Sequence, residues 1–582
     1  PRAKLRRSVC PSTSLSKYVV VFPFQRSRPV ASKTMTVINN NNNAICCVHS
    51  GGWRQSSTIR GRLAIDSIAD SPRMTTLFFF SETVLGVLYQ PLVAATALLT
   101  SAVVVYVVSF LWRVWALPPG PPALPFIGNL LQLRHARPLY IESAQWSRHY
   151  GDPITVWIGP RPVVVVSSTE GFRDLAGPLR NLVAGRMRSK QTDIIIRGNV
   201  DVAFSDFTPG WDVLRRVTHV ALRKYGQSDQ LAEASYSCVD RALNDVLKGE
   251  KQVITQVLSL IGDVINDIIA ISAFGGFDQE TRSDFRRLRD ITDEFIKELG
   301  SGLPSDILPV LGWIFYRKEQ YCISIMRNYM DIQDKMFDRA AGTYVPGEPP
   351  RHFTDMLLNA RDQLIAEARD SAKYLTLANL RQTVFDVFTG GTSTSRSSLC
   401  FALLHIADDP ELQAELREEV FSAIGDQMCV NEDLNKLPKL QSLIQEVLRL
   451  YPNAPLALPR RALGDVTISG RGVPKDTAVF INLWAVNHDP DIWGEDADRF
   501  NAKRFLTATK EQLSRGTTTF GIGARSCPGE KMALADFTYV LTRFLQRVRL
   551  SCPGGPATAN FSSTNGDISL DPVQQDIVIH QL

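Results

Sequence analysis

The stretch that decides the fold is Phe520-Gly521-Ile522-Gly523-Ala524-Arg525-Ser526-Cys527-Pro528-Gly529, a glycine-rich loop that presents one cysteine. From Glu530 to Leu550, apolar residues recur at helical spacing, which predicts a helix with one buried face. Cys527 is therefore expected at a helix N-terminus, where free N–H groups and the positive dipole end favour a thiolate. Pro528 suits the first turn, because its missing N–H has no intrahelical partner there.

A thiolate held in this way suits an axial position on haem iron. Gly523 and Gly529 let a flat macrocycle approach the backbone, and Arg525 is a cation suited to a propionate. A lone free cysteine is more often a small buried hydrophobic residue. Here, however, Phe520, Gly523, Arg525, Cys527 and Gly529 all match the haem-binding loop of cytochromes P450. The chain resembles that family, which implies haem b (iron protoporphyrin IX) as the cofactor and Cys527 as its iron ligand.

The resemblance extends over residues 117–582 and implies a mainly α-helical fold with a small β-rich part, the cytochrome P450 fold. The sequence patterns agree. Two β-rich runs, Ile154–Gly159 and Pro162–Ser168, predict paired strands, and Ala478–Leu483 predicts another strand. Most of the patterns between these strands are helical, and one helix, within Asp409–Gly425, has an N-cap, a first-turn proline and a glycine stop.

Residues 1–73 carry 12 Lys and Arg against 2 Asp and Glu. We interpret them as a disordered or untranslated extension ahead of Met74, although a mitochondrial transit peptide has a similar composition. The rest of the chain carries 52 basic against 57 acidic residues, so no basic nucleic-acid-binding face is implied. The nine cysteines are scattered without a CxxC pair, which suits reduced thiols on the cytosolic side of a membrane.

A membrane anchor is predicted within residues 74–116, because Leu92–Trp112 is 21 residues without a charge. Arg113 follows this span, which favours a cytosolic position for everything after it. A proline-rich hinge occupies residues 117–123, and the catalytic domain is expected over 124–582. This organisation resembles microsomal members of the family and predicts the endoplasmic reticulum membrane, with mitochondria as the alternative if 1–73 is a genuine transit peptide.

Glu446 and Arg449 lie one turn apart on a helix predicted over Gln441–Leu450. Such a pair is usually an exposed salt bridge of little energetic value. By resemblance it is the family's buried Glu-x-x-Arg pair, which locks with an arginine from a later segment. That segment here reads Ala502-Lys503-Arg504-Phe505, so Arg504 is the expected third partner, although the Pro and Glu that precede this arginine in the family are absent.

Other arginines are expected at the haem propionates by the same resemblance. Trp211 and Arg215 match the family's Trp-x-x-x-Arg pattern, in which both side chains reach a propionate. Arg460 occupies another propionate-binding position, and Arg186 is a weaker candidate. The alternative for each arginine is a solvated surface charge.

Gly390 and Gly391 interrupt a helical pattern, and glycine inside a helix is costly. In the family these glycines open a place for O₂, and an acid–alcohol pair delivers protons to it. Thr394 matches the alcohol, but Ser393 occupies the acid position. Proton delivery needs a donor or an organised water chain. Two hydroxyls, with Asp386 nearby, would have to order that water, so efficient oxygen activation is in question.

A substrate pocket is expected where relatives line theirs, and apolar pockets suit lipophilic ligands. The predicted lining residues are Phe385, Thr389, Gly390, Leu456, Ala457 and Leu458. Each of them alone is more often plain core.

The resemblance implies a haem–thiolate monooxygenase that inserts one oxygen atom from O₂ into a steroid, lipid or xenobiotic. NADPH would supply the electrons through a flavoprotein, NADPH–cytochrome P450 reductase, with cytochrome b5 as a further candidate partner. One alternative is a reductase-independent isomerase or dehydratase, which Ser393 favours because such enzymes need no oxygen-activating acid. A second alternative is a haem protein that binds a ligand without turnover.

Overall fold

The computed structural model describes residues 72–135, 137–276, 282–301, 303–307, 312–564 and 570–582. The predicted extension over residues 1–73 lies outside the described residues except for its last two. The longer or site-forming helices are α1 (Pro72–Ala116), α3 (Leu139–Tyr150), α4 (Thr169–Ala176), α5 (Lys190–Ile196), α6 (Pro209–Gly226), α7 (Asp229–Leu247), α8 (Val257–Phe274), α9 (Arg282–Ser301), α11 (Tyr316–Gly342), α12 (Phe353–Ala366), α13 (Leu377–Asp408), α14 (Pro410–Ala423), α15 (Pro438–Leu450) and α20 (Glu530–Arg547).

Short helices connect these elements, and the described strands are also brief. The short helices are α2 (Leu130–His135), α10 (Pro304–Ile307), α16 (Leu483–Asn487), α17 (Pro490–Trp493), α18 (Arg504–Thr507), α19 (Lys510–Gly516), η2 (Asp370–Tyr374), η3 (Asn431–Lys436) and η4 (Gly523–Arg525). The strands are β1 (Ile154–Ile158), β2 (Arg161–Val166), β3 (Gly185–Arg186), β4 (Gln252–Gln256), β5 (Arg460–Arg461), β6 (Val466–Ile468), β7 (Arg471–Val473), β8 (Ala478–Ile481), β9 (Val548–Ser551) and β10 (Asp576–Gln581).

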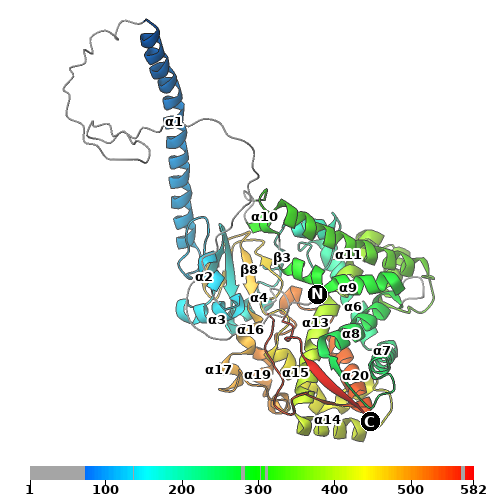
Figure 1. Ribbon diagram of the computed structural model, residues 1–582. Coiled ribbons are helices and arrows are strands. Elements are labelled where there is room, and N and C mark those ends of the chain that lie inside the picture. Colours follow the sequence, from blue (N-terminus) through cyan, green and yellow to red (C-terminus); the bar gives the residue numbers. More distant parts are fainter. Residues whose placement is uncertain (1–71, 136, 277–281, 302, 308–311, 565–569) are drawn as a thin grey trace, which may run out of the picture. The chain divides into compact units, whose positions relative to one another are not determined.

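Helices dominate the part of the chain that follows α1, with the largest sheet on one side of the helical core (Figure 1). That sheet has the strand order β1-β2-β8-β5-β3, in which β1 and β2 form the predicted antiparallel pair and β8 runs parallel to β2. Smaller sheets join β4-β10-β9 and β6-β7. The prediction of a mainly α-helical fold with a small β-rich part is confirmed.

The helix boundaries follow the local sequence signals closely. Asp409 caps α14 by accepting hydrogen bonds from the N–H groups of Glu411 and Leu412, as predicted for this helix. The helix predicted over 530–550 ends earlier, at Arg547, because Val548 to Ser551 form β9 and pair with β10. Val548 and Leu550 are buried on one face of this strand. Strand alternation therefore accounts for the apolar residues that the sequence analysis assigned to a helix.

Helix α13 runs through the middle of the helical core (Figure 1). It packs against α8, α20 and α15. Its buried residues belong to the largest hydrophobic cluster, together with residues of α7, α8, α11 and α20. Burial of such a large apolar surface fixes the helix rigidly. Residues of α13 therefore provide a firm wall for any site that they line.

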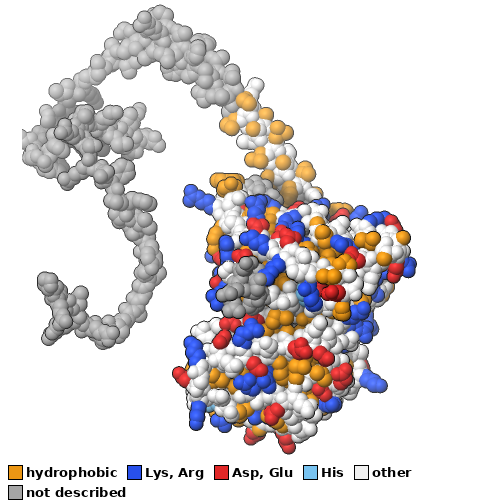
Figure 2. All heavy atoms as spheres, turned by 90° about the vertical axis from the view of Figure 1, so that its right-hand side faces the viewer, with side chains coloured by type: hydrophobic (Ala, Val, Ile, Leu, Met, Phe, Trp, Pro, Cys, Tyr) orange, Lys and Arg blue, Asp and Glu red, His pale blue; other side chains and the backbone are white. Residues whose placement is uncertain are grey.

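Helix α1 contains the predicted anchor, and its stretch from Gln90 to Ala116 is long and apolar enough to cross a membrane. Figure 2 shows hydrophobic side chains over the described part of this helix, whereas the face of the catalytic part turned to the viewer mixes acidic and basic groups. Near its C-terminus, Phe110 is fully buried against Trp157 at a ring-centroid distance of 4.6 Å. Arg113 also lies over the Trp157 ring. The end of the helix is thus packed against β1.

Candidate functional site

The cysteine loop approaches its neighbours closely and needs its glycines. Gly521 and Gly523 have φ values of +75° and +66°, a region that favours glycine. A Cβ on Gly523 would lie 2.8 Å from the carbonyl oxygen of Leu175. The Cys527 N–H donates to the carbonyl oxygen of Phe520 at 2.7 Å, which closes the loop. The loop geometry therefore fixes where the cysteine is presented.

Cys527 precedes α20, whose N-cap is Gly529 and whose first residue is Glu530. The sequence predicts Pro528 in the first turn of this helix, but the residue lies just before the helix. Burial raises the pKa of the Cys527 thiol, while the N–H groups of Gly529 and Glu530 and the charge of Arg215 oppose this rise. The expected helix-end donors are present, but burial outweighs them. A thiolate here needs a further positive charge, such as a metal ion, beside the sulfur.

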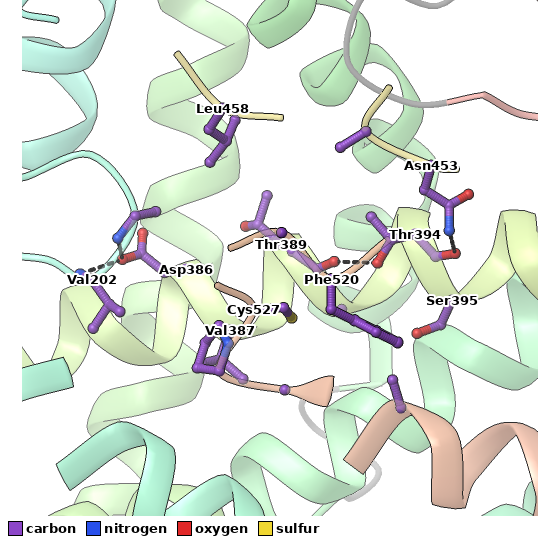
Figure 3. A pocket seen from close by; sticks show the side chains of 18 of the residues that line it. Val202, Asp386, Val387, Thr389, Thr394, Ser395, Asn453, Leu458, Phe520 and Cys527 are labelled. Atoms are coloured by element: carbon purple, nitrogen blue, oxygen red, sulfur yellow. Dashed lines mark hydrogen bonds between the residues drawn. The ribbon is translucent and has the colours of Figure 1, made fainter. Parts of the chain in front are cut away.

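Cys527 is exposed to a cavity of about 370 Å³ in the interior of the catalytic part. Most of the predicted site residues line it: Arg186, Arg215, Phe385, Asp386, Thr389, Gly390, Ser393, Thr394, Ala457, Leu458, Arg460, Phe520, Arg525, Cys527 and Gly529. Figure 3 shows Cys527 near the middle of this cavity, with Thr389 and Leu458 projecting toward one another on one side. The structure thus gathers residues from five distant segments around one sulfur atom.

Among the residues predicted to contact the cofactor or the substrate, three do not line the cavity: Trp211, Gly523 and Leu456. The Trp211 indole N–H donates to the carbonyl oxygen of Val202 at 3.1 Å, and Arg525 stacks over its ring at 3.9 Å. Trp211 is therefore held against Arg525 in this structure, and its contact with a propionate stays a prediction. Leu456 packs in a separate hydrophobic cluster beside the main sheet, and its backbone carbonyl accepts from Ile481.

Four arginines converge on one side of the cavity, and their charges repel one another. Burial, followed by the charges of neighbouring arginines, lowers the pKa of Arg460 to about 9 and that of Arg525 to about 8. Burial also lowers the pKa of Arg186 to about 10, and it lowers the pKa of Arg215. Because a guanidinium stays charged in proteins, these directions indicate an unfavourable gathering of positive charge. An anion with two or more charges would relieve it.

The hydrogen bonds of these arginines test whether a haem with two propionates fits. Arg525 donates to the carbonyl oxygens of Ala184 and Ser205, and Arg186 donates to that of Ala203. Arg460 uses only Nη2, which donates to Ile522, while its buried Nε and Nη1 have no partner. Unpaired buried donors are costly. Two orphaned donors, clustered charge and a cysteine open to the same cavity fit a dianionic macrocycle that is ligated through sulfur.

A buried ion-pair network lies beneath the site. The carboxylate of Glu446 is fully buried and accepts from Arg449 at 2.8 and 2.9 Å and from Arg504 at 3.0 Å. Arg449 also donates to the carbonyl oxygens of Asn487 and Ala497. These bonds tie α15 to the chain that leads into the cysteine loop. Arg504 occupies the place expected for the third partner, and Asp496 completes its hydrogen bonding.

Helix α13 passes Gly390 and Gly391 without a break in its helical assignment. A Cβ on Gly390 would meet no atom within 4 Å, so open space lies beside this residue. Thr394 donates to the carbonyl oxygen of Gly390 at 2.7 Å, and its own carbonyl accepts from Asn453 (Figure 3). Ser393 is buried on the cavity wall. This wall is rich in hydroxyl groups beside a space wide enough for small molecules.

The sequence patterns did not identify two residues of the site, Asn453 and Asp201. The Asn453 amide donates to the Thr394 carbonyl oxygen at 3.0 Å and to the Ser398 hydroxyl at 2.7 Å. No motif around Asn453 in the sequence indicates this role. Asp201 is fully buried near Asp386, and burial raises the pKa of both carboxyls. Only the packing of a loop against α13 brings the two acids together.

Comparisons with known proteins agree with this geometry. The family model described as Cytochrome P450 matches residues 118–577. Steroid 17-alpha-hydroxylase/17,20 lyase from Ictalurus punctatus is 28% identical over 455 residues, covering 75% of this chain and 86% of that protein. Cytochrome P450 1A1 from Pleuronectes platessa is 30% identical over 458 residues, with the same coverage. A zebrafish cytochrome P450 solved with progesterone has a TM-score of 0.66 at 24% identity, covering 77% of this chain and all of that one.

Proposed function

This chain belongs to the cytochrome P450 family of monooxygenases, and from that premise we propose that it oxygenates a lipophilic substrate at the cavity above Cys527. The proposed substrate class is a steroid or a xenobiotic of similar size, since the similar curated proteins include steroid hydroxylases and cytochromes P450 1A1. The observation that carries the proposal is the single cavity that holds Cys527, the arginine cluster and the hydroxyl-rich wall of α13.

We assign Cys527 as the axial ligand of haem b, with Arg215, Arg460 and Arg525 as the propionate partners. The unpartnered donors of Arg460 support this assignment. Bound there, a haem with thiolate ligation supplies the activation of O₂ that protein side chains lack. Glu446, Arg449 and Arg504 hold the surrounding segments in place, because an ion pair this deeply buried is stable only when complete.

The protein residues position the substrate, exclude water and handle protons. Phe385, Ala457 and Leu458 give the cavity an apolar side, which favours a lipophilic substrate over water. Ser393 and Thr394, from the same helix as Phe385, hold protons at their Oγ atoms near the open space at Gly390. A hydroxyl passes a proton on only when it receives another from a donor or from water.

The proposed setting is the cytosolic face of the endoplasmic reticulum membrane. The apolar stretch Gln90–Ala116 would anchor the chain, the prolines after it would form a stiff hinge, and the catalytic domain would follow. NADPH–cytochrome P450 reductase is the proposed electron donor, with cytochrome b5 as a second candidate.

The deciding experiment is expression of the chain from Met74, followed by the reduced, CO-bound difference spectrum and turnover with reductase and NADPH. We expect a red-shifted Soret band that Cys527→Ala abolishes, and oxygenated product only when reductase is present. Progesterone is a reasonable first substrate, because a structural neighbour was solved with it. Haem-loaded protein without such a band would refute thiolate ligation.

One observation favours a second function. Ser393 stands where an acid is expected, and a reductase-independent isomerase or dehydratase needs no oxygen-activating acid. Conversion of a hydroperoxide without reductase, together with no NADPH-dependent product, would select that function.

A further inference from the structure

A pair of buried acids lies beside the cavity, on the same side of α13 as the hydroxyl-rich wall. Asp386 is half-buried toward the cavity, and its Oδ2 accepts from the N–H groups of Val202 and Ala203 at 2.9 and 3.0 Å. Asp201 directly precedes those two residues and is fully buried. Its Oδ1 accepts from the N–H groups of Phe204 and Ser205. The two carboxyls are therefore anchored to one short loop.

Each carboxyl leaves its second oxygen without a partner: Oδ1 of Asp386 and Oδ2 of Asp201 are buried and unpaired. An ionised buried oxygen without a partner is costly, whereas a protonated carboxyl loses its charge and gains a donor. Burial raises the pKa of Asp386 well above its usual value, and the charge of Asp201 raises it further, against the opposing charge of Arg186. Arg525 acts in the same opposing sense on Asp201. Two raised pKa values and two unpaired oxygens therefore favour a proton shared by the pair.

The spacing along α13 links this proton to the hydroxyl-rich wall. Asp386, Thr389 and Ser393 follow one another at intervals of three and four residues, so they share one face of the helix. The Thr389 hydroxyl is buried beside the Tyr329 hydroxyl without a hydrogen bond of standard geometry, and open space lies beside Gly390, about one helical turn from both Asp386 and Ser393. Water in the cavity needs polar partners, and Asp386, Thr389 and Ser393 all line it.

We propose that Asp386, backed by Asp201, is the acid of this site and replaces the one missing at position 393. The inference rests on the proposed monooxygenase function. The O–H bond at Oδ1 of Asp386 breaks, and its proton passes to water beside Gly390 while the electron pair stays on the carboxylate. The water passes a proton through the hydroxyls of Thr389 and Ser393. That proton is consumed in the reduction of dioxygen, for which NADPH supplies the electrons. Bulk water then reprotonates the acid pair.

The first test is spectroscopic and does not depend on turnover. Infrared spectra of the haem-loaded protein at pH 7 should contain the C=O stretch of a protonated carboxylic acid that Asp386→Asn removes. Asp201→Asn removes a negative charge beside Asp386, so the band should then disappear at a lower pH than in the wild type. Absence of a band that depends on Asp386 would overturn the proposal.

The second test measures coupling, the product formed per NADPH consumed with reductase present. Asp386→Asn keeps the shape and both hydrogen bonds to the loop, yet it should lower coupling about tenfold and increase hydrogen peroxide. Thr389→Val should act in the same direction. The matched control is Thr392→Val, which removes a buried hydroxyl of the same helix that does not line the cavity and should leave coupling within twofold. The double variant Asp386→Asn/Ser393→Asp should recover coupling.

The outcomes separate this proposal from the function on which it rests. Normal coupling in Asp386→Asn, with the carboxyl band lost, would refute the acid and leave the monooxygenase intact. No NADPH-dependent product from the wild type would refute both. If Asp386→Asn does not load haem, Asp201→Asn and Thr389→Val decide the question, because unchanged coupling in both would overturn the relay.

Discussion

Glu446→Gln is the sharpest perturbation of the scaffold, because the carboxylate lies at the centre of a completely buried network. Its Oε1 accepts from Arg449, Arg504 and the N–H of Asn501, at 2.9 to 3.0 Å, and its Oε2 accepts from Arg449 Nε at 2.8 Å. Glutamine can keep the first oxygen. Its amide must then face the Arg449 Nε–H donor to donor, and the two guanidiniums lose the charge between them.

The magnitude follows from this burial. Breaking one side of a buried ion pair costs about 3–5 kcal/mol, because an uncompensated charge stays inside the protein. A domain has a total stability of about 5–15 kcal/mol, so the loss is a third or more of the stability in most cases. At about 1.4 kcal/mol for each factor of ten, the ratio of folded to unfolded protein falls roughly 10²- to 10⁴-fold. Haem loading in cells should fall accordingly.

Urea unfolding of purified protein, followed by far-ultraviolet circular dichroism, measures this loss. The matched control is Glu415→Gln, which removes a 2.9 Å pair with Lys503 whose side chains are 38% and 60% exposed. That pair should contribute little to stability, because solvent screens an exposed ion pair. If the two variants lose the same stability, the central role of Glu446 is refuted.

Three further predictions follow from the site. Ser393→Asp alone should leave the product formed per NADPH within about twofold, since Asp386 already supplies an acid to this cavity; a several-fold rise would show that the wild-type site lacks one. Arg460→Gln should speed haem loss to apomyoglobin roughly 10- to 100-fold and leave the haem-free protein at least as stable, because two unpaired donors and one repelling charge disappear. Burial raises the pKa of Asp536 from its ordinary value of about 4 to about 7, so the folded state binds its proton more tightly and stability should fall as pH rises from about 4 to about 7; urea unfolding across this range should lose that slope in Asp536→Asn but keep it in Asp426→Asn.

Local signals in the sequence predicted much of the architecture, whereas the resemblance to the family supplied the residues expected around the cavity. The helix that begins at Pro410 is marked by its cap and proline, and β1 and β2 are marked by their runs of branched residues. The end of α20 could not be predicted, because strand pairing with the distant β10 decides where Val548 changes from helix to strand. Nearby sequence contains no information about that partner.

The orientation of polar groups was equally inaccessible from sequence. The sequence could not show that the Trp211 indole N–H donates to the backbone carbonyl of Val202. The pairing of Asp201 with Asp386 depends on how a loop packs against α13, almost two hundred residues later in the chain. Spacing identifies residues that share a helix face, whereas contacts between distant segments require the packed structure.

The four converging arginines also set an order of events during biosynthesis. They belong to β3, α6, β5 and η4, so the last one is synthesised long after the first. Until an anionic partner arrives, repulsion between their charges opposes the hydrogen bonds that Arg460 and Arg525 donate to backbone carbonyls of other segments. We expect the nascent protein to remain open where these four segments meet and to be sensitive to proteases. Cofactor delivery would then close the molecule, and cells would remove copies that never receive it.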